Sequence, residues 1–473
     1  MSSLQVGSDS SGTLGRAIVV GFASSVAVWV TWFMTHLPWV GMSEPVSMPI
    51  VLGVWLLSGA FAVAWTERKN PVIVGILGGV VCALVGLLVL GTKVVPDAAA
   101  DGIAPGGTRD TLPSVALIIP AFLVLGGAIG VATGLVSRLV PKLCAGPSSA
   151  LAQMGVVVAI GITPLLVVGG LVTSTDSGMA VPDWPNTFGS NMFLYPLGPR
   201  SEPGLFLEHA HRLFGSLVGL MTLILAGWVI AQDSRRWVKV LAVVALSLVI
   251  VQGVLGGWRV LAGSDVPTED NRWLAMLHGV LGQLVFGVVV ALAATLSPLF
   301  RSGATVRPHA SIRRFKVFSA GLTHALILQL IFGAMYRHMR SGHALWTHAG
   351  FSVVIMVLAI VAGFVAIGLA RRDEGEDSPA GPAAAVPALA CTLRRIGLGL
   401  VIVVALQFAL GWAAFFVGGA ERTAANPTEA LIRTAHQANG AILIAFAALA
   451  FVWSRWVLRR AGVSAVSAPA GAA

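Results

Sequence analysis

Apolar stretches of about 20 residues recur along the whole chain, with short polar connections between them. Each stretch is long enough to cross a hydrocarbon layer of roughly 30 Å as a helix. Lipid offers no hydrogen-bond partners to the backbone, so a helix is favoured because it pairs its own N–H and C=O groups. The pattern predicts an all-α polytopic membrane protein with about 12 transmembrane helices. The predicted spans cover residues 16–35, 49–65, 71–92, 113–136, 152–173, 208–230, 238–258, 274–297, 316–336, 346–370, 395–417 and 435–456.

Composition supports a membrane location, because 56% of the 473 residues are hydrophobic and only 11% are charged. The net charge of +10 does not indicate a nucleic-acid partner, since Lys and Arg lie in short connections between spans. By the positive-inside rule, these connections place both termini in the cytoplasm and the protein in the cytoplasmic membrane. The basic connections are 68–69, 138–142, 235–239, 301–316, 371–395 and 455–460.

The three cysteines lie in a predicted span or in connections predicted to be cytoplasmic, and none forms a CxxC pair. We therefore expect neither a disulfide nor a cysteine metal site. They are Cys82, Cys144 and Cys391.

A repeat begins near residue 152, in which an outward helix with Gln followed four residues later by Gly precedes a returning helix that opens with His. An earlier copy has Gly169 and His211 but lacks the Gln. The four copies predict four histidines at one depth near the outer face. The later copies are Gln252, Gly256 and His278; Gln329, Gly333 and His348; and Gln407, Gly411 and His436.

Histidines inside a membrane are costly, and four in equivalent places favour a function over separate structural hydrogen bonds. Zinc prefers a tight tetrahedral cluster, whereas haem iron takes two axial ligands. The set therefore predicts two bis-histidine haem sites within helical bundles. A small residue four places after each histidine would leave room for a flat group; these are Gly215, Gly282, Ser352 and Gly440.

Charged residues accompany these histidines. Glu208 lies three residues before His211 on the same helix face. Its carboxylate would act on a porphyrin edge as a proton acceptor, or would complement the helix dipole; the residues alone leave both open. Three arginines near the outer helix ends are candidates for pairing with haem propionates, with interfacial snorkelling as the alternative. They are Arg212, Arg259 and Arg337.

Several motifs resemble the haem A synthase family over about residues 152–460: "GGLVTSTDSGMAVPDWPNTFG", "EHAHRLFGSLVGL", "VQGVLGGWRV", "MLHGVLGQ", "QLIFGAMYRH" and "RTAHQANGA". The resemblance implies two pseudo-symmetric four-helix bundles, which we place at 146–300 and 301–473. It also implies the site residues. His211 and His278 would be axial ligands of the substrate haem O, His348 and His436 would be axial ligands of haem b, and Glu208 would be the catalytic carboxylate.

The implied reaction is oxidation of the C8 methyl group of haem O to a formyl group, through hydroxylated intermediates, giving haem A for cytochrome oxidase. The implied partners are haem O, haem A, membrane lipid, haem O synthase and cytochrome oxidase assembly factors. The resemblance is also compatible with a homo-oligomer. Some relatives have a cysteine pair in the first outer loop, which residues 174–207 lack. Residues 1–145 form an extra four-span module, interpreted as an accessory packing or partner-docking module.

The alternative is a di-haem b membrane cytochrome or a haem carrier that exchanges electrons with quinone. An electron carrier has no need for a carboxylate in one half only. The positions equivalent to Glu208 before the other three histidines are Ala275, Leu345 and Arg433. This asymmetry favours the enzyme.

Overall fold

The computed structural model describes residues 12–66, 69–94, 111–141, 149–195, 201–263, 269–302, 310–374, 385–418 and 426–466. Within these residues the secondary structure is helical apart from one isolated bridge between Thr187 and Ser190. Twelve of the described helices are long and apolar enough to span a membrane. The predicted fold class and the number of spans are confirmed, and the chain is a multi-pass membrane protein. Cys144 and the middle of the 371–395 connection lie outside the described residues.

The helices cluster into two compact units, Met1–Asp233 and Ser234–Ala473. The boundaries at 145 and 300 come from the sequence repeat and stay predictions, as does the pseudo-symmetry of the two bundles. The first unit contains α1 (Thr13–His36), α2 (Glu44–Thr66), α3 (Pro71–Val94), α4 (Thr111–Val136), η1 (Ser137–Leu139), α5 (Ala150–Ser174) and α6 (Pro203–Gln232). The second contains α7 (Arg236–Leu261), α8 (Glu269–Leu296), α9 (Pro298–Arg301), α10 (Ala310–Met339), α11 (Gly342–Glu374), α12 (Ala385–Gly418) and α13 (Pro427–Val466).

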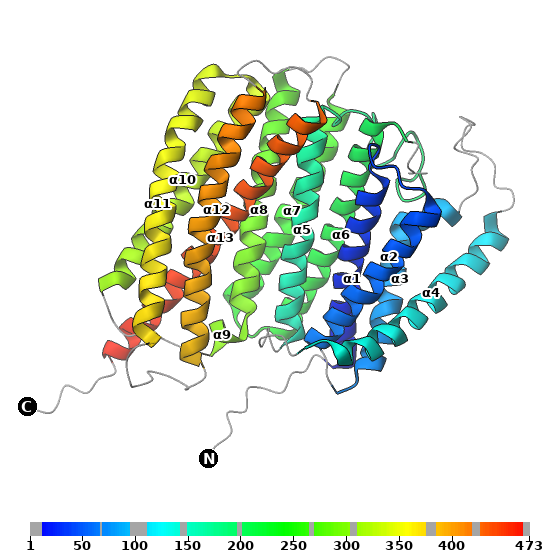
Figure 1. The fold of residues 1–473 in the computed structure, drawn as a ribbon, viewed down its shortest axis with the longest axis horizontal. Coiled ribbons are helices and arrows are strands. Elements are labelled where there is room, and N and C mark those ends of the chain that lie inside the picture. Colours follow the sequence, from blue (N-terminus) through cyan, green and yellow to red (C-terminus); the bar gives the residue numbers. More distant parts are fainter. Residues whose placement is uncertain are drawn as a thin grey trace, which may run out of the picture. The chain divides into compact units, whose positions relative to one another are not determined.

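In the first unit, α1 lies beside α5 and α6, so the N-terminal module shares a core with the start of the repeat (Figure 1). Ser149 caps α5 by accepting a hydrogen bond from the Ala152 amide, at 3.2 Å. Glu202 caps α6 in the same way, by accepting from the Leu205 amide at 2.9 Å, and Pro203 follows at the first helical position. These caps begin the helix pair that carries the first histidine.

In the second unit, a continuous apolar core runs between α10, α11, α12 and α13, and includes Phe315, Leu389 and Trp453. Helices α11 and α12 approach closely where Gly363 and Gly397 face each other, because a Cβ on either would press against the opposite backbone. Close helix packing of this kind fixes the depth at which each helix presents its polar residues.

Candidate functional site

All four repeat histidines pack their imidazole rings against the glycine of the preceding helix. A Cβ built on any of these glycines would lie 2.8–3.1 Å from Cε1 of the facing ring. A larger residue would therefore push the ring away. The glycine of each repeat is needed for close approach of the histidine. The pairs are Gly169 with His211, Gly256 with His278, Gly333 with His348, and Gly411 with His436.

The repeat glutamines tie each returning helix to its outward helix. The Gln252 side-chain amide donates to the backbone oxygen of His278 at 2.6 Å, and Gln329 donates to that of His348 at 2.9 Å. A Cβ on Gly282 would lie only 2.9 Å from the Gln252 amide nitrogen. At this position, and likewise at Gly440, a glutamine amide fills the space that the sequence suggested for a flat group.

Gln407 contacts the ring of its histidine rather than the backbone oxygen. Its amide nitrogen lies 3.3 Å and 3.4 Å from the two ring nitrogens of His436. Asn439 orients this amide by donating to the Gln407 side-chain oxygen at 2.8 Å, and also donates to the Val403 carbonyl at 3.0 Å. The His436 ring thus contacts Gly411 and the Gln407 amide, which Asn439 orients.

His348 and His436 come together in the second unit, with ring centres 6.1 Å apart and ring planes at 79°. Nδ1 of His348 lies 2.9 Å from the Gln329 backbone oxygen. Since a carbonyl only accepts, this nitrogen carries the proton, and the lone pair belongs to Nε2. Two imidazoles that held one metal ion from opposite sides would have ring centres roughly 6 Å apart, because each nitrogen would lie about 2 Å from the metal and about 1 Å from its ring centre. His348 and His436 would therefore be able to hold an iron between them.

In the first unit, Glu208 lies on α6 one turn before His211, and only 4% of it is exposed. Its Oε2 accepts a hydrogen bond from the Val181 amide at 2.9 Å, and its Oε1 accepts from Arg212 at 2.8 Å. An ionised carboxylate has about four acceptor sites. The two bonds therefore fix the carboxylate and leave it able to accept a proton.

Arg212 clamps the loop that covers the start of α6, residues 175–195, which we call the cap loop. Its two terminal nitrogens donate to the backbone oxygens of Val181, Asp183 and Asn186, at 3.0, 2.7 and 2.9 Å, in addition to the Glu208 bond. A propionate at Arg212 would compete with these four acceptors. The propionate role of this arginine stays a prediction.

His209 also holds the cap loop, and only 1% of it is exposed. One ring nitrogen lies 3.1 Å from the Thr187 hydroxyl, and the ring packs on Tyr195 with centres 5.5 Å apart. Burial, together with the nearby Asp183 carboxylate, raises the pKa of the Tyr195 hydroxyl. The phenol therefore stays protonated beside His209 at neutral pH.

The cap loop also folds on itself. The Asp183 carboxylate accepts from the backbone amides of Phe188 and Gly189, at 2.8 and 2.7 Å. Phe188 and Gly189 both have positive φ values, of 49° and 76°. Asp183 offsets this unusual turn by satisfying the two amides that it exposes. The loop is an ordered cover for Glu208.

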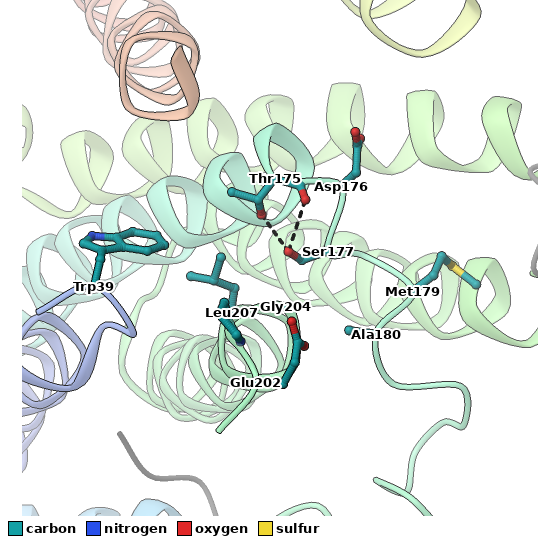
Figure 2. A pocket seen from close by; sticks show the side chains of 10 residues that line it. Trp39, Thr175, Asp176, Ser177, Met179, Ala180, Glu202, Gly204 and Leu207 are labelled. Atoms are coloured by element: carbon teal, nitrogen blue, oxygen red, sulfur yellow. Dashed lines mark hydrogen bonds between the residues drawn. The ribbon is translucent and has the colours of Figure 1, made fainter. Parts of the chain in front are cut away.

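A cavity of about 400 Å³ lies on another side of the cap loop. Trp39, from the connection after α1, forms one wall, and Leu207 and Glu202 of the α6 start face it across the opening (Figure 2). Ser177 of the cap loop completes the lining and shares a 2.6 Å hydrogen bond with the Thr175 hydroxyl. The N-terminal module thus reaches the cap loop itself.

Two further arginines lie in the last turns of their helices. Arg259 ends α7, where its backbone oxygen accepts from the Asn271 side chain at 3.1 Å. Arg337 lies in the last turn of α10, four residues after the Gly333 that contacts His348. Both arginines lie near helix ends, and their propionate roles stay predictions.

The chain is similar to known proteins over part of its length. A family model described as "Cytochrome oxidase assembly protein" matches residues 152–364. A protein named heme A synthase from Caulobacter sp. (strain K31) is 28% identical over 348 residues, covering 63% of this chain and 93% of the relative. One with the same name from Rhizorhabdus wittichii is 26% identical over 366 residues, covering 67% and 96%. Over these stretches the chain is similar to heme A synthases.

Higher identity is confined to shorter stretches. The heme A synthase of Halalkalibacterium halodurans is 36% identical over 128 residues, which are 27% of this chain and 40% of that protein. The one from Exiguobacterium sp. (strain ATCC BAA-1283 / AT1b) is 30% identical over 189 residues, covering 40% and 58%. The chain thus spans less than two thirds of these relatives, and the family model begins after the N-terminal module.

The four histidines proposed as haem ligands were predicted from the sequence, but the contacts that support them were not. The sequence did not indicate that His209 is buried or what the repeat glutamines contact. The available signal was the constant spacing of Gln and Gly, which places both on one helix face. No local signal could have shown that Arg212 holds a loop 26 to 31 residues away in the sequence.

Proposed function

We propose that this protein oxidises the C8 methyl group of haem O to a formyl group and so produces haem A. The observation that carries the proposal is Glu208, a buried carboxylate one turn before His211 and fixed by Val181 and Arg212. At the equivalent position of α13 stands Arg433, which forms an ion pair with Glu429. The asymmetry supports chemistry in the first half and electron transfer in the second.

In this proposal His211 and His278 bind the iron of the substrate haem O. They belong to different units, so their pairing rests on the repeat and on the family resemblance. Oxidation of a methyl group releases protons, and Glu208 accepts a proton or stabilises positive charge at the porphyrin edge. The cap loop keeps water from this carboxylate and, through Arg212, prevents it from turning away.

His348 and His436 would hold haem b in the second unit. The 6.1 Å spacing of the rings and the Nδ1 hydrogen bond of His348 support this assignment. When bound, haem b supplies one-electron transfer. The residues of this half orient the two rings, through Gln329 on one side and through Gln407 with Asn439 on the other.

The wild-type protein tests the proposal directly. We expect protein purified from cells that make haem O to carry b-type haem together with haem O or haem A, identified by extraction and chromatography. Cells without the protein should accumulate haem O. A protein that carries only b-type haem, and is reversibly reduced by quinol without change to the porphyrin, would instead be the electron-carrying cytochrome.

Replacement of Gly333 by Ala is expected to weaken b-type haem binding by roughly 10-fold to 100-fold, the usual cost of disturbing the support of a metal ligand. The added methyl group would lie 2.8 Å from Cε1 of His348 and displace the ring. Haem titration of the stripped protein measures this. Gly368→Ala is the matched control in α11, because no described atom lies within 4 Å of a Cβ there.

A further inference from the structure

The helix that carries Glu208 and His211 lacks the tie found in the other three helix pairs. Helices α8 and α11 are held at the ligand depth by Gln252 and Gln329, and α13 by Gln407. The equivalent residue of α5 is Leu165. No described atom lies within 4 Å of a Cβ built on Gly215, the place where the other pairs receive the amide. The cap loop contacts α6 through His209 and Arg212, and a further contact must take the place of the missing glutamine.

The N-terminal module provides that contact. Phe206 and Phe214 of α6 lie on either side of His211 along the sequence, and they are 0% and 2% exposed. Phe33 of α1 bridges them, with ring centres 5.7 Å from Phe206 and 5.9 Å from Phe214. Trp29, one turn earlier on α1, meets Phe214 edge to face at 5.9 Å. Aromatic rings in such arrangements fix one another's orientation.

The same module also holds α5, the helix against which His211 packs. The Gln153 side-chain amide donates to the backbone oxygen of Trp65 in α2 at 3.0 Å. A Cβ on Gly161 of α5 would lie 3.3 Å from Val26 of α1. Contacts from one module thus set both helices of the first pair.

We propose that the aromatic face of α1, formed by Trp29 and Phe33, is a positioning element for His211 and Glu208. It replaces the glutamine tie that the first helix pair lacks. The inference rests on the proposed function for the identity of the bound haem. The N-terminal module lies outside the region matched by the family model, and this proposal gives it a role in the substrate site.

The contact with α1 restrains rotation and tilt of α6. Without the α1 contact, α6 would be held by its packing on α5 and by the cap loop, which contacts it through His209 and Arg212. Any rotation of the helix would carry its ligands with it. Phe33 contacts the α6 face five residues before and three residues after His211. Loss of its ring would leave a space into which α6 can relax. The His211 ring would then leave Gly169, and Glu208 would move with it.

The test is Phe33→Ala in the full-length protein, with Met34→Ala as control, because Met34 is the next residue and is 53% exposed. We expect Phe33→Ala to lower the ratio of bound substrate haem to haem b by roughly 10-fold, as for other supports of a metal ligand. The low-spin electron paramagnetic resonance signal of the remaining substrate haem should shift. Haem b, held in the second unit, should be unchanged in amount and spectrum, and Phe33→Leu should restore most of the ratio.

A second substitution separates positioning from simple packing. Leu165→Gln, added to Phe33→Ala, places an amide where Gly215 leaves room and should raise the ratio again. If it does not, the equivalence with the glutamine ties is overturned. A wild-type ratio in Phe33→Ala, or equal loss of both haems, overturns the positioning role. A wild-type protein without haem O or haem A would refute the proposed function itself, whatever Phe33 does.

Discussion

The Glu208→Gln variant is expected to retain both haems and to form haem A at least roughly 100-fold more slowly than the wild type, the usual range for loss of a proton-transfer group. The amide has nearly the same shape as the carboxylate. It cannot take up a proton in the same way, and only one of its two terminal atoms can accept a hydrogen bond. Chromatography of haem extracted from cells that make haem O measures the loss.

Glu202→Gln is the matched control for this prediction. Glu202 is a second carboxylate at the start of the same helix, where it caps α6 through the Leu205 amide and lies outside the buried cluster around Arg212. We expect near-normal haem A from this variant. Normal haem A formation by Glu208→Gln would remove this carboxylate from catalysis and leave it only a role in holding the cap loop.

The His436→Ala variant is expected to lose b-type haem almost completely. His436 is one of the two rings whose 6.1 Å separation fits a shared iron, and the nearby Gln407 and Asn439 amides do not replace an imidazole as an iron ligand. The optical spectrum and a pyridine haemochrome assay measure the loss. Added imidazole should restore part of the low-spin spectrum, because it can enter the space left by the side chain.

His324→Ala is the control for this ligand. His324 is exposed on α10, and its Nδ1 bonds to the Ala320 backbone oxygen within the same helix at 2.8 Å. The substitution should leave both haems in place. Unchanged b-type haem in His436→Ala would contradict the assignment of the second site, whereas loss that imidazole cannot reverse would indicate damage to the bundle rather than loss of a ligand.

Length and composition of the apolar stretches were sufficient to predict the spans. The helices α5, α6 and α7 cover the predicted spans 152–173, 208–230 and 238–258 with ends a few residues longer. The lipid requirement for internal backbone hydrogen bonds leaves few alternatives to a helix. The repeat also grouped each Gly with the His of the returning helix, because Gln, Gly and His follow in the same order in the later three copies.

Contacts between distant segments could not be predicted in this way. Arg212 looked like a partner for a haem propionate or for the membrane interface, yet its terminal nitrogens hold the cap loop. His209 lies outside the repeat, and its burial depends on the packing of the cap loop. Nothing in the spacing of residues 1–145 indicated that Phe33 would contact α6, since that contact depends on which helices pack side by side.

The sequence by itself determined the helices and the single carboxylate beside His211, because these depend on helical periodicity and on the thickness of the bilayer. The common depth of the four histidines stays a prediction. Only the tertiary structure decided what holds those residues in place. The glutamine amides at the second, third and fourth histidines, the cap loop over Glu208 and the aromatic face of α1 behind α6 all join segments far apart in the chain. Such contacts follow from side-chain packing between helices, which the local pattern of a single helix does not specify.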